Sequence, residues 1–261
     1  MKKNPFKRML CIVIAAVMLC SVFASTAAAA TKCACGHSPV VMISGFGATI
    51  LSEKQEDGSL KRVFPPDTKE ILKLLGVNAP DLVTGIIELL AQKGTDGIEK
   101  PMREIITSIV EPLRMNDDGT SYYDIVPILS GAKNTSLEAF TKNDQLDLVP
   151  YTGSEFLDME VIGDEIGDDH VFNFLYDWRL SHADVAAQLH DYLAEVCALT
   201  GHDKVSVYSI SQGSLLLGTY MYEYPNDNYI DRAVFDTPLL AGSNLVSDLY
   251  TDTVSYTHLT L

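Results

Sequence analysis

The sequence predicts an α/β fold built on a doubly wound, mostly parallel sheet. Short apolar runs bounded by turn residues predict buried strands. In the last third of the chain, amphipathic runs that alternate with these strands predict helices. The 261 residues, 47% hydrophobic and 21% charged, suffice for one domain of this class. This composition excludes fibrous, low-complexity and disordered classes.

The first thirty residues have the pattern of a secretory signal peptide. Basic residues through Arg8 precede an apolar run over residues 9–24, and small residues follow as far as Ala30. The run is shorter than the roughly 20 apolar residues that cross a bilayer. We therefore expect residues 1–30 to be cleaved from a secreted protein, which then has no stable membrane anchor.

The charge of the chain is strongly acidic. Nineteen basic residues face 35 acidic ones, for a net charge of −16. The leader holds four of the basic residues and no acid, so the remainder has 15 basic and 35 acidic residues, a net charge of −20. Such a chain is a poor partner for nucleic acid or for an anionic membrane surface.

After loss of the leader three cysteines remain, Cys33, Cys35 and Cys197, an odd number that does not describe a disulfide-built scaffold. Cys33, Cys35 and His37 offer three soft ligands, whereas a structural zinc site needs four and the sequence shows no fourth. The sequence therefore predicts no metal and no cofactor. We expect a flexible thiol pair or a strained disulfide at Cys33 and Cys35, and a core position for Cys197 on an apolar helix face.

The first strand is predicted at residues 39–43, an apolar run followed by a loop with two glycines at 44–48. Residues 51–165 then change to helical segments separated by Pro, Gly and Asp-Gly turns. Two of these segments carry apolar residues at helical spacing, namely Leu82, Ile86, Ile87, Leu89 and Leu90, and then Ile105, Ile106, Ile109 and Leu113. Ordinary core helices are favoured, and a cap that meets an apolar substrate is the alternative.

Strands and helices alternate in the last third of the chain. Ser181 and Asp184 form a capping box before a helix that ends near Gly201. The predicted order is strand 171–176, helix 181–201, strand 204–210, helix 212–224 and strand 230–235. This alternation predicts a parallel sheet.

The junction of the third strand and its helix reads Ser209-Ile210-Ser211-Gln212-Gly213, a variant of the small-x-Ser-x-Gly nucleophile elbow. A strand that turns abruptly into a helix strains its turn residue and needs small neighbours two positions away. We expect the Ser211 hydroxyl to project above the sheet. The N–H of Gln212, at the helix N-terminus, then points to where an oxyanion would form.

Residues 204–213 line up without gaps on the nucleophile strand of α/β-hydrolases. Three further segments, in the right order, resemble the lecithin:cholesterol acyltransferase-like branch of that superfamily. Residues 39–47 resemble its first strand and oxyanion loop, and residues 176–180 match its Tyr-Asp-Trp-Arg-Leu segment. Residues 230–243 resemble the strand and Gly-Ser turn after the elbow. The resemblance covers residues 40–253. Within it, the helical insertion over residues 51–165 matches in its position along the chain only.

The resemblance implies an α/β-hydrolase-type fold in which residues 51–165 form a helical cap or lid. It implies a serine acyltransferase or lipase that takes an acyl group from a lipid ester, at a micelle or membrane interface, and passes it to water or to another alcohol. Ser211 would be the nucleophile, and the backbone N–H groups of Phe46 and Gln212 would form the oxyanion hole. No cofactor is implied.

The chain departs from the family pattern at three positions near the predicted site. Ser44 stands where the family usually has Pro, Ser209 where the elbow usually has Gly, and Ile210 where His is frequent. Ser209 matters most, because a larger side chain there is expected to crowd the turn, with consequences for activity rather than for the fold.

Catalytic triads of this fold run Ser, acid, His along the chain. Asp236, at the end of the fourth strand, is a candidate acid, with a turn-capping role as the alternative. Of the histidines, His170, His182 and His202 precede the elbow, so we expect them to be surface or turn residues. His190 is expected to be exposed and inert.

The only histidine after Ser211 is His258, within residues 254–261. That segment resembles the translation of an adaptor used in DNA library preparation, and an ordinary C-terminus is the alternative. We expect 254–261 to be a non-native tail and the hydrolase domain, residues 31–253, to be incomplete at its C-terminus. Two other function classes stay open: a non-catalytic secreted binding domain on a hydrolase scaffold, and a peptidase or small-ester esterase.

Overall fold

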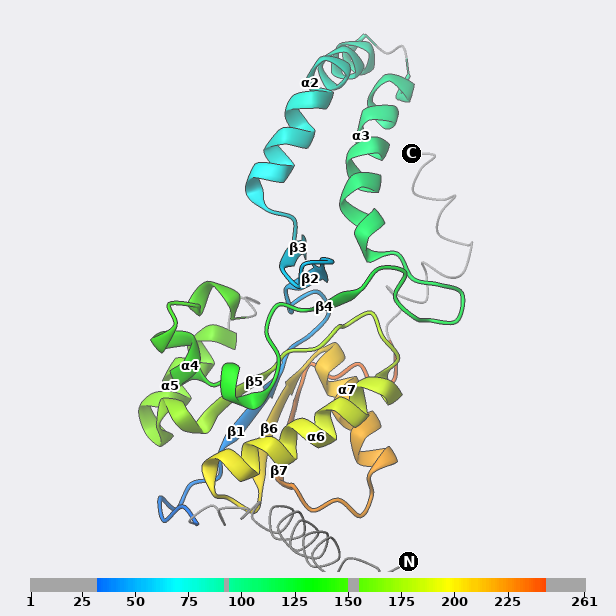
Figure 1. Cartoon of the computed structure of the whole chain (residues 1–261). Coiled ribbons are helices and arrows are strands. Elements are labelled where there is room, and N and C mark those ends of the chain that lie inside the picture. The colour runs from blue at the N-terminus through cyan, green and yellow to red at the C-terminus, as the bar shows by residue number, and fades with distance from the viewer. Residues whose placement is uncertain (1–31, 92–93, 150–154, 243–261) are drawn as a thin grey trace, which may run out of the picture.

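In the computed structural model, which describes residues 32–91, 94–149 and 155–242, a four-stranded parallel sheet forms the centre of the chain, with helices on both faces (Figure 1). Its strands, in the order β5-β1-β6-β7, are β1 (Val40–Ile43), β5 (Val171–Phe174), β6 (Val205–Ile210) and β7 (Ile230–Asp236). The α/β class is confirmed. The predicted leader, 1–30, and tail, 254–261, lie outside the described residues.

Side chains of β1 alternate between two apolar clusters, one on each face of the sheet. Val41 and Ile43 join the larger cluster, under helices α6 (His182–Thr200) and α7 (Gln212–Glu223). Met42 joins the smaller one, under α4 (Leu137–Lys142) and α5 (Glu155–Ile166). Burial on both faces explains why this strand is a continuous apolar run in the sequence.

Helix α6 follows the predicted boundaries, but its start differs from the prediction. Ser181 occupies the N-cap position, yet its side chain makes no capping hydrogen bond, so the predicted capping box is not formed. Gly201 ends the helix in the left-handed conformation, at φ 70° and ψ 24°, as its sequence position suggests. Cys197 is buried in the core cluster, and burial raises the pKa of its thiol to about 11.

The insertion between β1 and β5 contains a small antiparallel sheet that the sequence analysis did not predict. Its order is β3-β2-β4, with β2 (Leu51–Lys54), β3 (Leu60–Phe64) and β4 (Ile125–Pro127). Strands β2 and β3 are short and largely polar, and β4 contains Pro127, so none of the three has the uninterrupted apolar run that predicts a buried strand. Four 3₁₀ turns complete the described elements: η1 (Glu111–Leu113), η2 (Ala132–Asn134), η3 (Leu146–Leu148) and η4 (Asp168–His170).

Helices α2 (Thr68–Leu90) and α3 (Asp96–Val110) form a hairpin that projects away from the parallel sheet (Figure 1). The two backbones meet where a Cβ added to Gly85 would lie 2.4 Å from the carbonyl carbon of Gly97. Ile86, Ile87 and Ile106 are exposed on this α2–α3 hairpin. Interpretation of this segment as ordinary core helices is therefore wrong at these positions. The side chain of Leu89 lies outside the described part.

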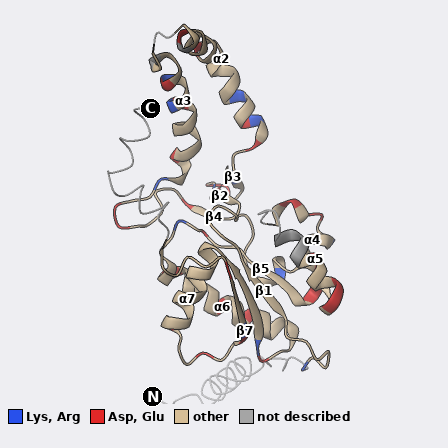
Figure 2. Cartoon of the chain, turned by 180° about the vertical axis from the view of Figure 1, so that it is seen from behind, with Lys and Arg blue, Asp and Glu red and all other residues tan. Residues whose placement is uncertain are grey.

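No helix in the described ranges combines the length and the hydropathy needed to span a bilayer. Lys and Arg are scattered along the elements in Figure 2, whereas a group of acidic residues, coloured red, marks one end of α5.

Candidate active site

Ser211 lies at the junction of β6 and α7 with a strained backbone. Its φ of 52° and ψ of −117° fall outside the regions that L-residues usually adopt. Ile210 is the last residue of the strand and Gln212 the first of the helix, so the change of direction falls on Ser211. The Ser211 N–H donates to the carbonyl oxygen of Asp236, 3.0 Å away, which ties the turn to β7. The predicted strand-turn-helix setting is therefore present.

Two glycines allow the segments around Ser211 to approach one another. A Cβ on Gly213 would lie 2.3 Å from the carbonyl oxygen of Ile43 and 2.7 Å from that of Ser44, closer than any Cβ can sit. A Cβ on Gly45 would lie 3.1 Å from the Ser211 Cβ and 3.6 Å from its Oγ. The loop after β1 therefore packs directly against the Ser211 side chain.

The predicted oxyanion donors belong to the two segments that adjoin Ser211. Gln212 is the first residue of α7, so its N–H has no acceptor within the helix and lies at the positive end of the helix dipole. Phe46 follows Gly45 in the loop that contacts Ser211. Its side chain is 66% exposed, and its ring meets Trp178 edge-on with 4.4 Å between centroids.

The Tyr-Asp-Trp-Arg-Leu segment, residues 176–180, joins the loop after β1 to the turn at Ser211. The hydroxyl of Tyr176 donates to the carbonyl oxygen of Ser44, at 2.9 Å. The side-chain amide of Gln212 donates to the carbonyl oxygen of Trp178, at 2.9 Å, while the Trp178 indole donates to that of Thr49, at 3.3 Å. These buried bonds fix the relative positions of β1, the segment after β5, and α7.

A buried ion pair holds the same segment in shape. Asp177 and Arg179 are 3% and 4% exposed, and Arg179 donates Nε to Oδ1 at 2.9 Å and a terminal nitrogen to Oδ2 at 2.6 Å. The same terminal nitrogen also donates to the hydroxyl of Ser121, 2.9 Å away, on the insertion. The pair therefore links the segment after β5 to residues that precede β4.

Ser209, at the position where the resemblance predicts glycine, is buried in the sheet with its hydroxyl hydrogen-bonded. It is fully buried, and its Oγ donates to the carbonyl oxygen of Val234 at 2.9 Å. A second hydroxyl, that of Ser214 on α7, lies 3.1 Å from the Ser209 Oγ and donates to the Ser209 carbonyl oxygen at 3.0 Å. The extra side chain therefore contributes hydrogen bonds between β6, β7 and α7.

Asp236 ends β7 beside the elbow, but its carboxylate is taken up by a tyrosine. The hydroxyl of Tyr208 donates to Oδ2 of Asp236 at 2.6 Å. Within the described part of the chain, no histidine hydrogen-bonds to Asp236 or to Ser211. The backbone carbonyl of Asp236 therefore bonds to Ser211, whereas its carboxylate bonds to Tyr208 on the neighbouring strand β6.

The histidines that precede the elbow lie in three different settings. His182 begins α6 with its Nε2 buried and without a described partner, and burial lowers its pKa. His190 was predicted to be exposed and inert, but it is half-buried, with its Nδ1 2.7 Å from Oδ2 of Asp227 and its ring stacked on Tyr224. His170 and His202 precede β5 and β6, so they lie at the amino ends of the strands, opposite Ser211. His170 is buried rather than at the surface. His258 lies outside the described residues.

The sequence matches no protein-family model and no curated protein, so the resemblance to α/β-hydrolases rests on the residues and geometry given above.

Proposed function

We propose that this chain is a secreted, α/β-hydrolase-type serine acyltransferase or lipase that acts on lipid acyl esters through Ser211. The observation that carries the proposal is the conformation of Ser211, at φ 52° and ψ −117° between a parallel strand and a helix N-terminus. Strain of this kind is maintained only where the surroundings enforce it, and it gathers at functional sites. Here Gly45 and Gly213 let the surroundings close around the serine.

The chemistry follows from the parts in place. The Ser211 Oγ attacks the ester carbonyl carbon, its proton passes to a general base, and the negative charge develops on the carbonyl oxygen. The N–H groups of Phe46 and Gln212 stabilise that charge, and the alcohol leaves with the proton. Water or an acceptor alcohol then attacks the acyl-serine ester and regenerates Ser211. The base would come from outside the described residues.

Exposed apolar side chains near the elbow and on the insertion support a lipid substrate. Phe46 is exposed beside Ser211, and Trp178 lies edge-on between it and Phe64, with centroid distances of 4.4 and 5.1 Å. Among the described side chains of the α2–α3 hairpin, ten large apolar ones are exposed: Leu72, Leu75, Val77, Val83, Ile86, Ile87, Leu90, Met102, Ile106 and Val110. An apolar surface of this extent is typical of protein, membrane or ligand contacts.

The net charge favours a neutral lipid surface over an anionic one. Without the leader the chain carries −20, and like charges repel it from anionic headgroups. We expect binding to neutral micelles and weaker binding to anionic vesicles. Stronger binding to the anionic vesicles would contradict this part of the proposal.

A turnover assay tests the proposed function. Acyl esters of increasing chain length are supplied to the protein as monomers and in neutral micelles. We expect Ser211→Ala to abolish turnover and Ser206→Ala, on the same strand, to retain it. Faster turnover of long-chain esters in micelles supports a lipid substrate, whereas preference for short soluble esters supports the small-ester esterase.

One observation favours a non-catalytic binding domain as the second candidate. The carboxylate of Asp236 bonds to Tyr208, and no described histidine reaches Ser211. Binding of neutral micelles by the folded protein without any turnover would support this second candidate.

A further inference from the structure

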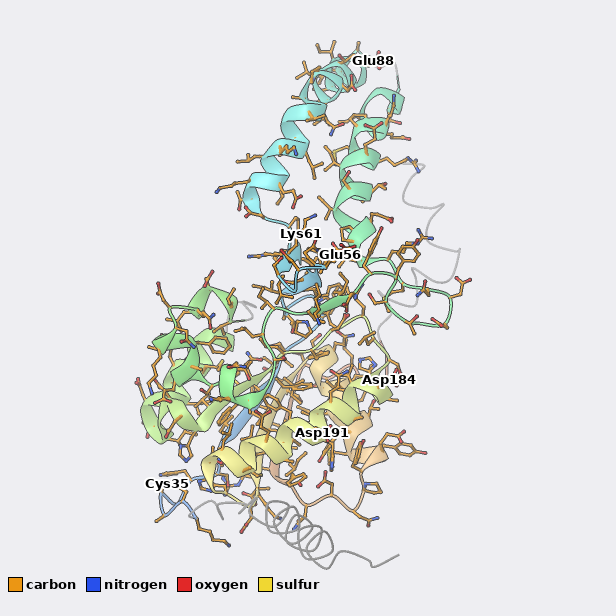
Figure 3. All side chains as sticks on the ribbon, viewed as in Figure 1. Cys35, Glu56, Lys61, Glu88, Asp184 and Asp191 are labelled. Atoms are coloured by element: carbon orange, nitrogen blue, oxygen red, sulfur yellow. The ribbon has the colours of Figure 1, made fainter. Side chains whose placement is uncertain are left out.

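Two cysteines and two histidines meet at the edge of the parallel sheet that lies opposite the elbow. Cys33 and Cys35 precede β1, His170 directly precedes β5, and His202 precedes β6. Because β5, β1 and β6 are adjacent and parallel, the residues before them share one edge, the amino edge. Cys35 is labelled there in Figure 3. Ser211 follows β6, whose six residues at about 3.3 Å each separate it from this edge by about 20 Å.

The four side chains have the spacing of metal ligands. Their ligating atoms all lie within 4.8 Å of one another. The His170 Nε2 is 3.7 Å from the sulfur of Cys33 and 3.7 Å from that of Cys35, and the His202 Nε2 is 3.4 Å from the Cys35 sulfur. In a tetrahedral site with Zn–S of about 2.3 Å and Zn–N of about 2.0 Å, neighbouring ligand atoms are about 3.3–3.8 Å apart. The measured distances fit that geometry.

The surroundings of His170 have the features of an outer shell. Its Nδ1 lies 2.8 Å from Oδ1 of Asp169, which leaves Nε2 directed at the two sulfurs. A carboxylate on the far nitrogen is the usual partner of a metal-bound histidine, because it fixes the ring and raises its basicity. The rings of His170 and His202 are nearly perpendicular, at 85°, with 5.3 Å between centroids.

Contacts outside the cluster hold the cysteine segment in place. The backbone N–H of Cys33 donates to the carbonyl oxygen of Gly201, 3.1 Å away, beside His202. Lys32 pairs with Asp203 at 2.7 Å, on the other side of the same histidine. The backbone N–H of Cys35 donates to the Cys33 sulfur at 3.4 Å. The segment before β1 is therefore attached to the loop before β6 independently of any ion.

We propose that Cys33, Cys35, His170 and His202 bind one zinc ion in a closed tetrahedral site. Both thiols release their protons on binding, so two thiolates balance the charge of Zn²⁺. Four protein ligands leave no position for water or substrate, which is the pattern of a structural rather than a catalytic zinc. The ion would join the segment before β1 to the residues that precede β5 and β6. Its role is separate from the chemistry proposed for Ser211.

Metal analysis of the full chain, purified without chelators from zinc-containing medium, tests the proposal. We expect one zinc per chain, and we expect Cys35→Ser and His202→Ala to lose it. His37→Ala and Cys197→Ser are the matched controls, because His37 is exposed outside the cluster and Cys197 is buried in the core. Both controls retain the zinc. Asp169→Asn keeps all four ligands, and we expect it to weaken zinc affinity by about 10–100-fold.

A second measurement covers variants that fail to fold. Chelator is added to the unaltered chain, then removed, and zinc is restored, with the melting temperature and the number of reactive thiols followed throughout. We expect the melting temperature to fall and recover, and two thiols to become reactive only after chelation. Zinc-free protein that lacks two thiols under denaturing conditions would show a Cys33–Cys35 disulfide and overturn the proposal. Zinc-free protein in which Cys33 and Cys35 are both reactive thiols, or zinc retained by Cys35→Ser, would overturn it as well.

Discussion

The carbonyl oxygen of Ile43 lies where Gly213 has no room for a Cβ, since that atom would be 2.3 Å away. The first turn of α7 and the end of β1 are therefore in backbone contact, with Ser211 held between them and β7.

Gly213→Ala should destabilise the protein by about 2–3 kcal/mol, because backbone atoms rather than a flexible side chain block the new methyl group. Gly218 is the matched control in the same helix, since a Cβ there meets only the end of Leu240, at 3.0 Å. We expect Gly218→Ala to change stability by less than about 1 kcal/mol, because the helix propensity of alanine offsets the contact. Urea unfolding measures both, and equal losses would show that the close approach at Gly213 is unimportant.

Ser209→Gly introduces the residue that is usual at this position in the α/β-hydrolases that the sequence resembles. We expect this substitution to reduce the stability of the protein. The hydroxyl bonds to Val234 and Ser214 would be lost, at a cost of about 1 kcal/mol. A glycine within β6 adds about 0.5–1 kcal/mol. Urea unfolding should therefore show a loss of about 1–2 kcal/mol, with a smaller effect for Ser206→Ala. A gain in stability would mean that Ser209 strains the turn.

A charge on the α2–α3 hairpin should impair action on lipid surfaces and leave the fold intact. Ile87 is 60% exposed on α2, so Ile87→Asp is expected to change stability by no more than about 0.5 kcal/mol. Val161 is the matched control, because it is 64% exposed on α5, a helix that lies away from the hairpin (Figure 1). We expect Ile87→Asp to lower turnover of micellar long-chain esters but not of soluble short ones, and Val161→Asp to lower neither. Equal effects of both variants would exclude a special role for the hairpin.

Asp227 makes the free energy of unfolding depend on pH in the acid range. Burial alone would raise the pKa of Asp227, but hydrogen bonds from Tyr220 and His190 outweigh it and hold that pKa below its usual value. Because the folded pKa lies below the unfolded value of about 3.9, this stabilisation is complete above about pH 5 and is lost as the pH falls through the folded pKa.

Asp227→Asn should therefore reduce stability by about 1–3 kcal/mol at neutral pH and flatten the acid side of the stability profile. Urea unfolding between about pH 7 and pH 3 measures the profile. Asp191→Asn removes an exposed charge from α6 (Figure 3) and should keep the original slope. An unchanged slope in Asp227→Asn would contradict the assignment.

The parallel sheet could be predicted because its strands carry their own signal. Apolar runs bounded by turn residues placed β1, β5, β6 and β7 to within two residues at each end. Strands β2 and β3 carry no such run, the run that contains β4 is interrupted by Pro127, and all three depend on pairing with one another, which sequence patterns do not show. The exposed hairpin was misjudged for a related reason, since an amphipathic pattern does not reveal what covers its apolar side.

The elbow could be predicted because its residues are consecutive, whereas the contacts that position it could not. The bonds from Gln212 to Trp178 and from Ser209 to Val234 depend on how distant segments pack. The proposed zinc site was missed for the same reason. The sequence offers Cys33 and Cys35 beside His37, whereas His170 and His202 reach the two thiols only through the fold, and Cys33 and His170 are 137 residues apart. The available signal was positional, since each ligand comes shortly before a strand of one parallel sheet.

The central proposal is that Ser211 is an activated nucleophile, and a fluorophosphonate label tests it most directly. The folded protein is treated with the reagent, and the modified peptide is identified by mass spectrometry. We predict one adduct, on Ser211, that is absent from Ser211→Ala and from heat-denatured protein. A well-folded protein without an adduct at Ser211 would contradict the proposal.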